Sequence, residues 1–526
     1  MAATATISGT LQPPAKAGFN KRHLAAFLFM VFGMFMAILD IQIVSSSLAE
    51  IQAGISASAD EISWVQTSYL IAEVVMIPLS GTLTRIFSTR YLFTASAIGF
   101  TLMSFMCAMS GSINEMMVWR ALQGFIGGAM IPTVFAVTFS IFPPDKRVII
   151  TPLIGLIATL APTIGPTVGG YLTELLSWHW LFLINIIPGI AVALGTWFLV
   201  DFDKPDWKLA WNFDWLGLAL LAVFLGTLEY TLEEGPGDDW FDSHLILTLT
   251  LTCIATGTAF FWRMATSKFP LVDFTAFKNR NFTSGSIFSF TMGIGLYGLT
   301  YLYPVYLARV QHYSALMIGE TMFVTGVAMF LTAPVAGRIS AMVDPRVMVG
   351  TGFAGFALGT WMASGITVDW SFSELLIPQI LRGVSLMLCM VTITNVSLGT
   401  LSPLQIRGAS GLFNLTRNLG GAVGLAIINT VMNKRMDLHL ARLHESVSWG
   451  KTQADETLAN ITASLSQLGS DAGAAALSRL AGIVRTQAMT MAIADVFYLL
   501  TFLFIGIIIM LPLMQKPSSG MGGGGH

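Results

Sequence analysis

Residues 25–40 read AAFLFMVFGMFMAILD, an unbroken run of apolar and small residues that ends in an aspartate. An α-helix rises about 1.5 Å per residue, so about 20 largely apolar residues are needed to cross the hydrocarbon core of a bilayer. Lys16, Lys21 and Arg22 precede the run as in a signal peptide, but the run is too long and has no small-residue cleavage site. We therefore predict a first membrane helix that is retained.

Similar runs recur along the whole chain. Its 526 residues are 54% hydrophobic and 11% charged, whereas roughly a quarter of the residues in soluble domains are charged. Fourteen runs are long enough to span a bilayer, centred near residues 35, 71, 102, 126, 161, 190, 223, 254, 294, 326, 357, 386, 420 and 501. We predict an all-α polytopic membrane protein with fourteen spans.

The net charge of -2 and the lack of a Walker or Rossmann phosphate loop argue against nucleic acid and nucleotides as partners, and we expect no cofactor and no metal.

The distribution of lysine and arginine predicts the orientation. With the N-terminus inside, the short outer loops contain only Arg309, whereas the inner segments contain many basic residues, among them Arg85, Arg90, Lys146, Arg147, Arg263, Arg338, Arg346 and Arg407. This contrast follows the positive-inside rule. We predict that both termini lie in the cytoplasm; a location in the bacterial inner membrane is implied only by the family resemblance given below. A polar outer loop at 433–488 has apolar residues spaced as in short amphipathic helices; it is either a solvated cap or a docking surface for a periplasmic partner.

Two short patterns occur twice and indicate an internal duplication. PLSG at 78–81 is matched by PVAG at 334–337, and Arg120, which precedes Gly124, is matched by Arg382 beside a glycine. Both pairs fall in register if the seventh and eighth helices are an insertion between two six-helix halves. Such repeats are typical of transporters, with the substrate path near the midplane between the halves. The predicted segments are a cytoplasmic tail at 1–24, a first half at 25–201, two inserted helices at 202–281, a second half at 282–513 that includes the loop 433–488, and a Gly-rich tail at 514–526.

Ionisable residues inside predicted spans are costly to bury and are therefore functional candidates. Asp40, Glu73, Arg120 and Glu320 are the candidates for proton coupling. Asp40 is either a proton carrier or a structural carboxylate paired to an arginine, and Arg120, which keeps its proton, would act as an electrostatic gate. Glu73 and Glu320 occupy repeat-related helices and either attract cations into a cavity or are simply solvated. Glu229 and Asp495 are given no role in transport.

A substrate cavity is predicted between the halves. Aromatic residues of the ninth helix, including Tyr303, either line this cavity or pack as ordinary helix contacts. The predicted lining residues are Gln42, Gln123, Phe290, Tyr297, Tyr301, Arg382, Asn395, Asn414 and Arg417.

The fifth helix contains the sequence APTIGPTVGG at 161–170. Ala161, Gly165 and Gly169 recur every four residues and form a small-residue face that permits close helix packing. Pro162 and Pro166 loosen the helix at the same place, so we expect it both to pack tightly and to bend.

These residues resemble the major facilitator superfamily, and within it the fourteen-helix drug:proton antiporters of the EmrB and QacA group. The resemblance covers nearly the whole chain: Gly165, Pro166, Gly169 and Gly170 look like the family's antiporter motif, residues 120–124 like its helix-four motif, and Asp40 like its helix-one motif. Residues 81–90 depart from the helix 2–3 loop motif because they lack its acidic residue. The long outer loop and the Gly-rich end resemble EmrB-type subunits, which implies a periplasmic adaptor protein and an outer-membrane channel as partners.

The resemblance implies a major facilitator fold and proton-coupled multidrug efflux, with amphipathic or hydrophobic small molecules exported by alternating access and the proton gradient as energy source. An exporter of one metabolite, such as a siderophore, fatty acid or bile salt, is the alternative. A membrane enzyme acting on a lipid-linked substrate would need clustered carboxylates; Asp238, Asp239 and Asp242 have that spacing, but a solvated acidic loop explains them better. An uncoupled channel or receptor is a further alternative.

Overall fold

The computed structural model describes residues 21–58, 61–267, 270–340, 342–447, 451–465 and 471–515. Every regular element within these ranges is a helix, which confirms the all-α prediction. Most of the predicted tails at 1–24 and 514–526 lies outside the described residues.

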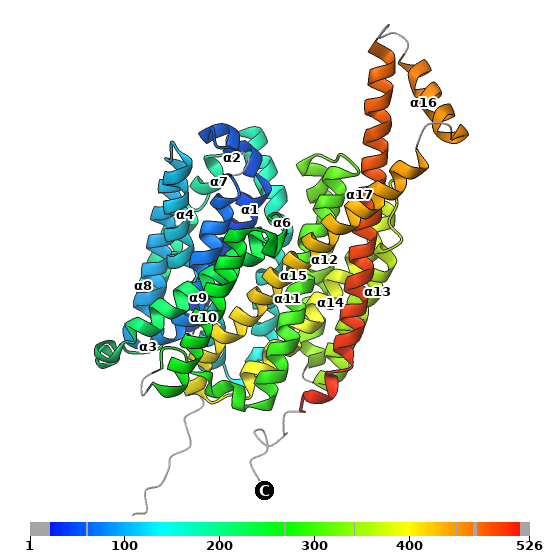
Figure 1. The fold of residues 1–526 in the computed structure, drawn as a ribbon. Helices are drawn as coiled ribbons and strands as arrows, with labels where there is room; N and C mark the ends of the chain where they lie inside the picture. The colour runs from blue at the N-terminus through cyan, green and yellow to red at the C-terminus, as the bar shows by residue number, and fades with distance from the viewer. Residues whose placement is uncertain are drawn as a thin grey trace, which may run out of the picture.

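The first group of helices covers residues 21–199 and forms one side of the molecule in Figure 1. It consists of α1 (Lys21–Ser46), α2 (Leu48–Ile55), α3 (Trp64–Ala108), α4 (Ile113–Gly127), α5 (Met130–Ile141), α6 (Pro144–Leu175), α7 (Trp180–Leu183) and α8 (Ile186–Leu199). Ser88 lies inside α3 with φ 75° and ψ 160°, so α3 is two helical arms joined at a kink. A positive φ is strained for serine, which marks this residue as held by its surroundings.

A second group follows after two helices that connect the groups. The connecting helices are α9 (Trp215–Glu234) and α10 (His244–Thr266), flanked by the short helices η1 (Trp207–Asn212), η2 (Trp240–Asp242) and η3 (Phe274–Lys278). The second group consists of α11 (Arg280–Arg309), α12 (Ala315–Ser340), α13 (Pro345–Ala363), α14 (Phe372–Gly399), α15 (Pro403–Ser446), α16 (Thr452–Ser464) and α17 (Ala472–Ile508), with η5 (Leu511–Leu513) after it.

The centre of each of the fourteen predicted runs lies within a helix, and two of these centres lie in the two arms of α3. Among the described residues, nine helices are long and apolar enough to cross a membrane, or ten if one bent pair is counted as a span. The prediction of a membrane protein is therefore confirmed, while the number fourteen stays a prediction. Large apolar side chains cover the outer faces, as at Ile187 and Trp262, where lipid would contact them.

The helices α1 and α17 place their chain ends on one side of the molecule, which we call the termini end. Arg22 at the beginning of α1 donates to the carbonyl of Phe198 over 2.9 Å, and Arg280 at the beginning of α11 donates to the carbonyl of Leu513 over 3.0 Å. We call the opposite side the far end.

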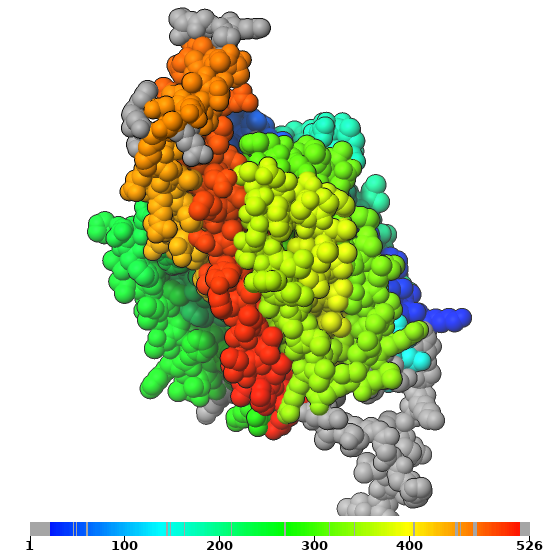
Figure 2. All heavy atoms as spheres, turned by 90° about the vertical axis from the view of Figure 1, so that its right-hand side faces the viewer, coloured from blue at the N-terminus to red at the C-terminus, as the bar shows by residue number. Residues whose placement is uncertain are grey.

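Helices α15 and α17 continue well past the rest of the bundle at the far end, and α16 packs against α17 (Figures 1 and 2). The predicted loop 433–488 is thus largely a pair of extended spanning helices rather than a set of separate short ones. Asp495 ties the two extensions together, with its carboxylate 2.8 Å from Nε2 of His439 and 3.5 Å from Nε of Arg435. This contact is structural and lies away from the bundle interior.

Helix α6 has the predicted bend, with an angle of 43° between the segments 149–161 and 164–175. A Cβ atom added at Gly165 would lie 2.4 Å from Cβ of Gln42 in α1, and one added at Gly319 of α12 would lie 2.0 Å from the hydroxyl of Thr167. The small residues of α6 therefore allow close contact with the first group on one side and with the second group on the other.

The connecting helices are held to each other by a charged contact at the termini end. Asp214, which caps α9, accepts from the backbone N–H of Gly217 over 2.8 Å and pairs with Arg263 of α10 over 2.7 Å. Burial raises the pKa of the Asp214 carboxyl, but the bonds from Arg263 and Gly217 outweigh it and hold the pKa below its usual value.

Candidate functional site

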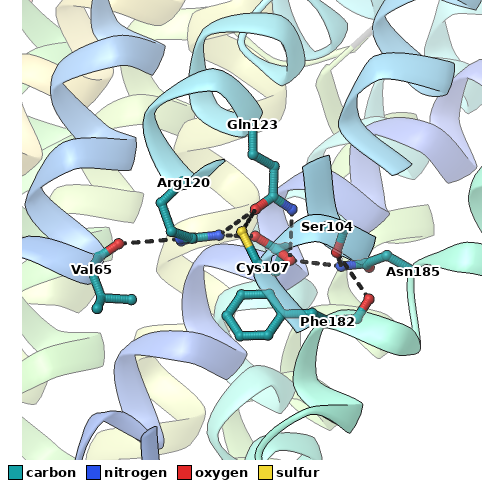
Figure 3. A network of polar contacts seen from close by, with 8 residues as sticks. Val65, Ser104, Cys107, Arg120, Gln123, Phe182 and Asn185 are labelled. Carbon is teal, nitrogen blue, oxygen red and sulfur yellow. Dashed lines mark hydrogen bonds and ion pairs between the residues drawn. The ribbon is translucent and has the colours of Figure 1, made fainter. Parts of the chain in front are cut away.

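A buried ion pair joins α1 to α4 inside the first group (Figure 3). Nη1 of Arg120 lies 2.6 Å from Oδ2 of Asp40, and both side chains are fully buried. Gln123, one turn further along α4, accepts from the same Nη1 over 2.9 Å and donates to Oδ1 of Asp40 over 3.2 Å. The helix-one and helix-four residues predicted for proton coupling are therefore in direct contact.

Other helices complete this network. Asn185 donates to Oδ1 of Asp40 over 2.6 Å and to the hydroxyl of Ser104 over 3.1 Å. The Nε of Arg120 donates to the carbonyl of Val65 over 3.1 Å, and its Cζ lies 4.2 Å from the ring centroid of Tyr69. Asp40 is thus bonded on both oxygens and shielded from water, as a structural carboxylate paired to an arginine would be. Carrying a proton would require this network to open.

A central cavity lies between the two groups and the connecting helix α9. One part of it, at mid-depth, is lined by residues of α1, α3, α5, α6, α9, α11 and α15; a second part continues toward the far end. The two parts share Ile41, Gln42, Leu70, Glu233, Tyr297 and Leu425, so they adjoin each other. The cavity occupies the position predicted for a substrate path.

The mid-depth part contains three carboxyl groups and one guanidinium. Glu73 of α3, Glu229 and Glu233 of α9, and Arg417 of α15 all line it. Among the described residues, none of the three glutamates forms an ion pair or accepts a hydrogen bond. Arg417 donates to Oδ1 of Asn414 over 2.6 Å, while its Nε has no partner. Since one cation can balance only one carboxylate, the remaining carboxyl groups must take up protons or balance a charge that enters the cavity.

The cavity reaches the far end of the molecule. Its outer part is lined by the helix ends at Ser45, Ser63 and Arg309 and by Tyr301, whose hydroxyl donates to Asn429 over 2.7 Å. Most of its lining is apolar and aromatic, which suits an amphipathic molecule.

Contacts between the two groups close the termini end. A Cβ atom at Gly81 of α3 would lie 2.6 Å from the carbonyl oxygen of Arg407 in α15, so the two backbones touch. Thr151 of α6 donates to Asn395 of α14 over 2.9 Å. The cavity is therefore accessible from the far end and sealed at the termini end.

Asp203 reinforces this seal. It accepts from the backbone N–H of Thr89 over 2.9 Å and from the Thr89 hydroxyl over 3.0 Å, and it lies 3.3 Å from Nη2 of Arg407. The segment 81–90 lacks the acidic residue of the family motif, and Asp203, which follows α8, brings a carboxylate to this segment from elsewhere in the chain.

The structure separates the predicted site residues into several places. Gln42, Tyr297, Tyr301, Glu73 and Arg417 line the cavity, and Asn414 holds Arg417. The remaining predicted residues do not line it: Gln123 belongs to the Asp40 network, Asn395 to the seal, Phe290 packs against Gly420, Arg382 is buried beside Thr300, and Glu320 has an exposed side chain on α12.

The sequence analysis gave Glu229 no role in transport and did not expect Glu233 at the cavity, yet both glutamates of α9 line it. Glu229 and Glu233 are four residues apart and share one helix face, and this spacing was a visible signal that α9 directs a polar face to one place. Because the connecting helices were expected outside the substrate path, the signal was not used. Asn185 was not among the predicted site residues, although it donates to Asp40.

The profile of the Major Facilitator Superfamily matches residues 30–425. The chain belongs to the Major Facilitator Superfamily. Colistin resistance protein EmrB of Acinetobacter baumannii is 42% identical over 485 residues, covering 92% of this chain and 94% of the relative. Fatty acid resistance protein FarB of Neisseria gonorrhoeae is 31% identical (95% and 97% covered), and multidrug export protein EmrB of Escherichia coli is 30% identical (93% and 95% covered).

Solved structures agree on the fold. The human organic anion transporter MFSD10 matches with a TM-score of 0.55 at 13% identity, covering 94% of this chain and 100% of that chain. The predicted facilitator fold and the resemblance to EmrB-type transporters are thus confirmed. The chain is a multi-pass inner-membrane transporter of small molecules, and not an enzyme.

Proposed function

We propose that this facilitator exports amphipathic small molecules in exchange for protons by alternating access. The observation that carries the proposal is the central cavity, which is open to the far end, sealed at the termini end and lined by carboxyl groups that form no ion pair or hydrogen bond with the described residues. A drug-sized molecule would lie against its apolar wall. Opening of the contacts at Gly81, Asp203 and Asn395 would expose the same cavity to the termini end.

Glu73 is the proton carrier in this proposal. It is 3% exposed, lines the cavity and shares it with Arg417. With the cavity open to the far end, Glu73 and a glutamate of α9 take up protons, which removes unbalanced charge from the membrane interior. When the cavity has opened to the termini end, Glu73 releases its proton and becomes a carboxylate again. Substrate then binds in the cavity and is carried toward the far end in the next step.

The Asp40–Arg120 pair holds α1, which lines the cavity, against α4. Asp40 lies one turn or less from Ile41 and Gln42, both of which line the cavity, so breaking the pair would change the cavity wall. This gives Asp40, Arg120 and Gln123 a role in coupling through position rather than by contact with the substrate.

The orientation and partners follow from charge and from similarity. The positive-inside pattern supports cytoplasmic termini, and with that orientation the far end and the α15–α17 extension would lie in the periplasm. The extension offers a surface for a periplasmic adaptor protein, through which an outer-membrane channel would be reached. The names of the relatives support colistin, fatty acids and several drugs as candidate substrates.

Reconstituted vesicles test the proposal. The purified protein would be placed in proteoliposomes that contain a pH-sensitive dye, and dodecyltrimethylammonium or laurate would be added without any imposed gradient. An antiporter moves protons only when substrate moves, so substrate addition should change the internal pH in proportion to the protein. Proton flux without substrate would indicate an uncoupled channel, and substrate flux without any proton flux would remove the proton from the mechanism.

A further inference from the structure

Arg382 is a buried cation without a counter-ion. It lies in α14 with 2% of its surface exposed, and Nη2 donates to the hydroxyl of Thr300 in α11. Its Nε and Nη1 are buried and have no acceptor. The ring of Tyr303 lies 5.8 Å from its Cζ, and among the described residues no carboxylate pairs with it. Burying an unpaired guanidinium in a membrane interior costs free energy, and an anionic acceptor at this place would lower that cost.

The first group shows what such a site contains when it is complete. Arg120 of α4 reaches the first helix of its group and meets the carboxylate of Asp40. Arg382 of α14, the fourth spanning helix of the second group, likewise reaches the first helix of its group, but it meets Thr300 there. The two arginines occupy repeat-related helices, and only the second one lacks its carboxylate.

Thr300 separates Arg382 from the central cavity. Thr300 lines the outer part of the cavity beside Tyr297, Tyr301 and Pro304. Its hydroxyl donates to the carbonyl of Leu296 over 2.6 Å and accepts from Arg382. Arg382 is therefore one side chain away from the cavity, and a change in the Thr300 side chain is the movement that contact between the guanidinium and the cavity requires.

We propose that Arg382 and Thr300 form an anion site that binds the carboxylate headgroup of an amphipathic substrate while its apolar tail lies along the cavity. The ligand provides Arg382 with a carboxylate, as Asp40 does for Arg120. This inference rests on the proposed export function and makes it more specific, because it names the residues that would bind monoanionic amphiphiles and distinguish them from cations. Arg309, exposed at the outer end of the same cavity, lies on the path by which an anion would enter or leave.

The test introduces a carboxylate into the protein at the place where the ligand carboxylate would bind. Thr300→Asp places a carboxylate next to Arg382, so it should compete with the headgroup without creating an unpaired charge. Ser373→Asp adds the same charge at the exposed first turn of α14 and serves as the matched control. The proteins would be studied in phosphatidylcholine nanodiscs with radiolabelled laurate and dodecyltrimethylammonium, which share one alkyl tail and differ in the charge of the headgroup.

We expect Thr300→Asp to lower the affinity for laurate by about tenfold or more, since a charge-assisted hydrogen bond contributes about that factor. The affinity ratio of laurate to dodecyltrimethylammonium should fall with it, whereas Ser373→Asp should leave the ratio at its wild-type value. An unchanged ratio in a folded Thr300→Asp protein overturns the anion site but leaves the export function standing. A wild-type protein that binds neither probe in nanodiscs and transports neither in proteoliposomes instead overturns the export function itself.

A second variant keeps the test decisive if Thr300→Asp does not fold. Arg382→Met removes the charge without leaving a buried carboxylate behind, and apolar replacements of buried charges are often tolerated. The anion site predicts that Arg382→Met folds and has lost selective binding of laurate. A folded Arg382→Met protein with the wild-type ratio of affinities would assign Arg382 to packing and remove the site.

Discussion

Removal of the charge on Asp40 should destabilise the protein through Arg120. Asp40→Asn keeps the size of the side chain but replaces one carboxylate oxygen with an amide nitrogen. In the wild-type protein Arg120, Gln123 and Asn185 donate to the carboxylate oxygens over 2.6–3.2 Å. An amide nitrogen cannot accept these hydrogen bonds. Both charges are fully buried, and leaving one buried charge without its partner costs about 3–5 kcal/mol. We expect the free energy of unfolding in mild detergent to fall by this amount.

A double-mutant cycle separates the ion pair from other effects. Arg120→Gln alone should cost a similar free energy, whereas Asp40→Asn with Arg120→Gln should cost less than the sum of the two single changes, because no unpaired charge remains. Asp201→Asn, which breaks a solvent-exposed contact with Arg90, is the control and should cost less than about 1 kcal/mol. Additive costs for the buried pair would refute the reasoning.

Three further predictions concern the seal, the helix packing and the pH dependence of stability. Asp203→Asn should loosen the seal at the termini end, seen as faster hydrogen–deuterium exchange in residues 77–90 and 403–411; unchanged exchange would mean that Asp203 does not hold the seal. Gly165→Ala should lower the free energy of unfolding by about 1–3 kcal/mol, because its Cβ would lie 2.4 Å from Gln42. The control Gly506→Ala, where nothing lies within 4 Å of the added Cβ, should leave that free energy unchanged. Equal unfolding free energies for the two variants would contradict the packing. Because the pKa of Asp214 is lowered in the folded protein, its contribution is present above the unfolded value of about 3.9 and is lost as the pH falls through the folded pKa. Asp214→Asn should therefore be less stable than wild type near pH 7 and approach it in acid, and a difference that persists in acid would rule out the carboxylate as its source.

The membrane helices and the buried charges in α1 and α4 could be predicted from the sequence alone. Membrane spans and buried ionisable residues follow directly from hydropathy and the cost of burial, and Arg120 and Asp40 are indeed in contact. Which helix face meets the cavity could not be predicted, since it depends on helix rotation and on packing between the groups. For this reason Glu320 was grouped with Glu73, although its side chain is exposed on α12.

The connecting helices show the same limit more clearly. Treating them as an insertion set aside Glu229 and Glu233, yet α9 packs against α3 and α15 and closes one side of the cavity. The acidic residue missing from 81–90 is another example, because Asp203 supplies a carboxylate from more than a hundred residues further along the chain. Such replacements are invisible until the fold brings distant segments together.

The most direct test of proton-coupled export is the transport cycle of Glu73→Gln in proteoliposomes. The account predicts that this variant still exchanges labelled for unlabelled substrate across the membrane, since the cavity remains, but no longer accumulates substrate when a pH gradient is imposed. Glu320→Gln, whose side chain lies outside the cavity, should accumulate substrate as wild type does. Full gradient-driven accumulation by Glu73→Gln would contradict the account.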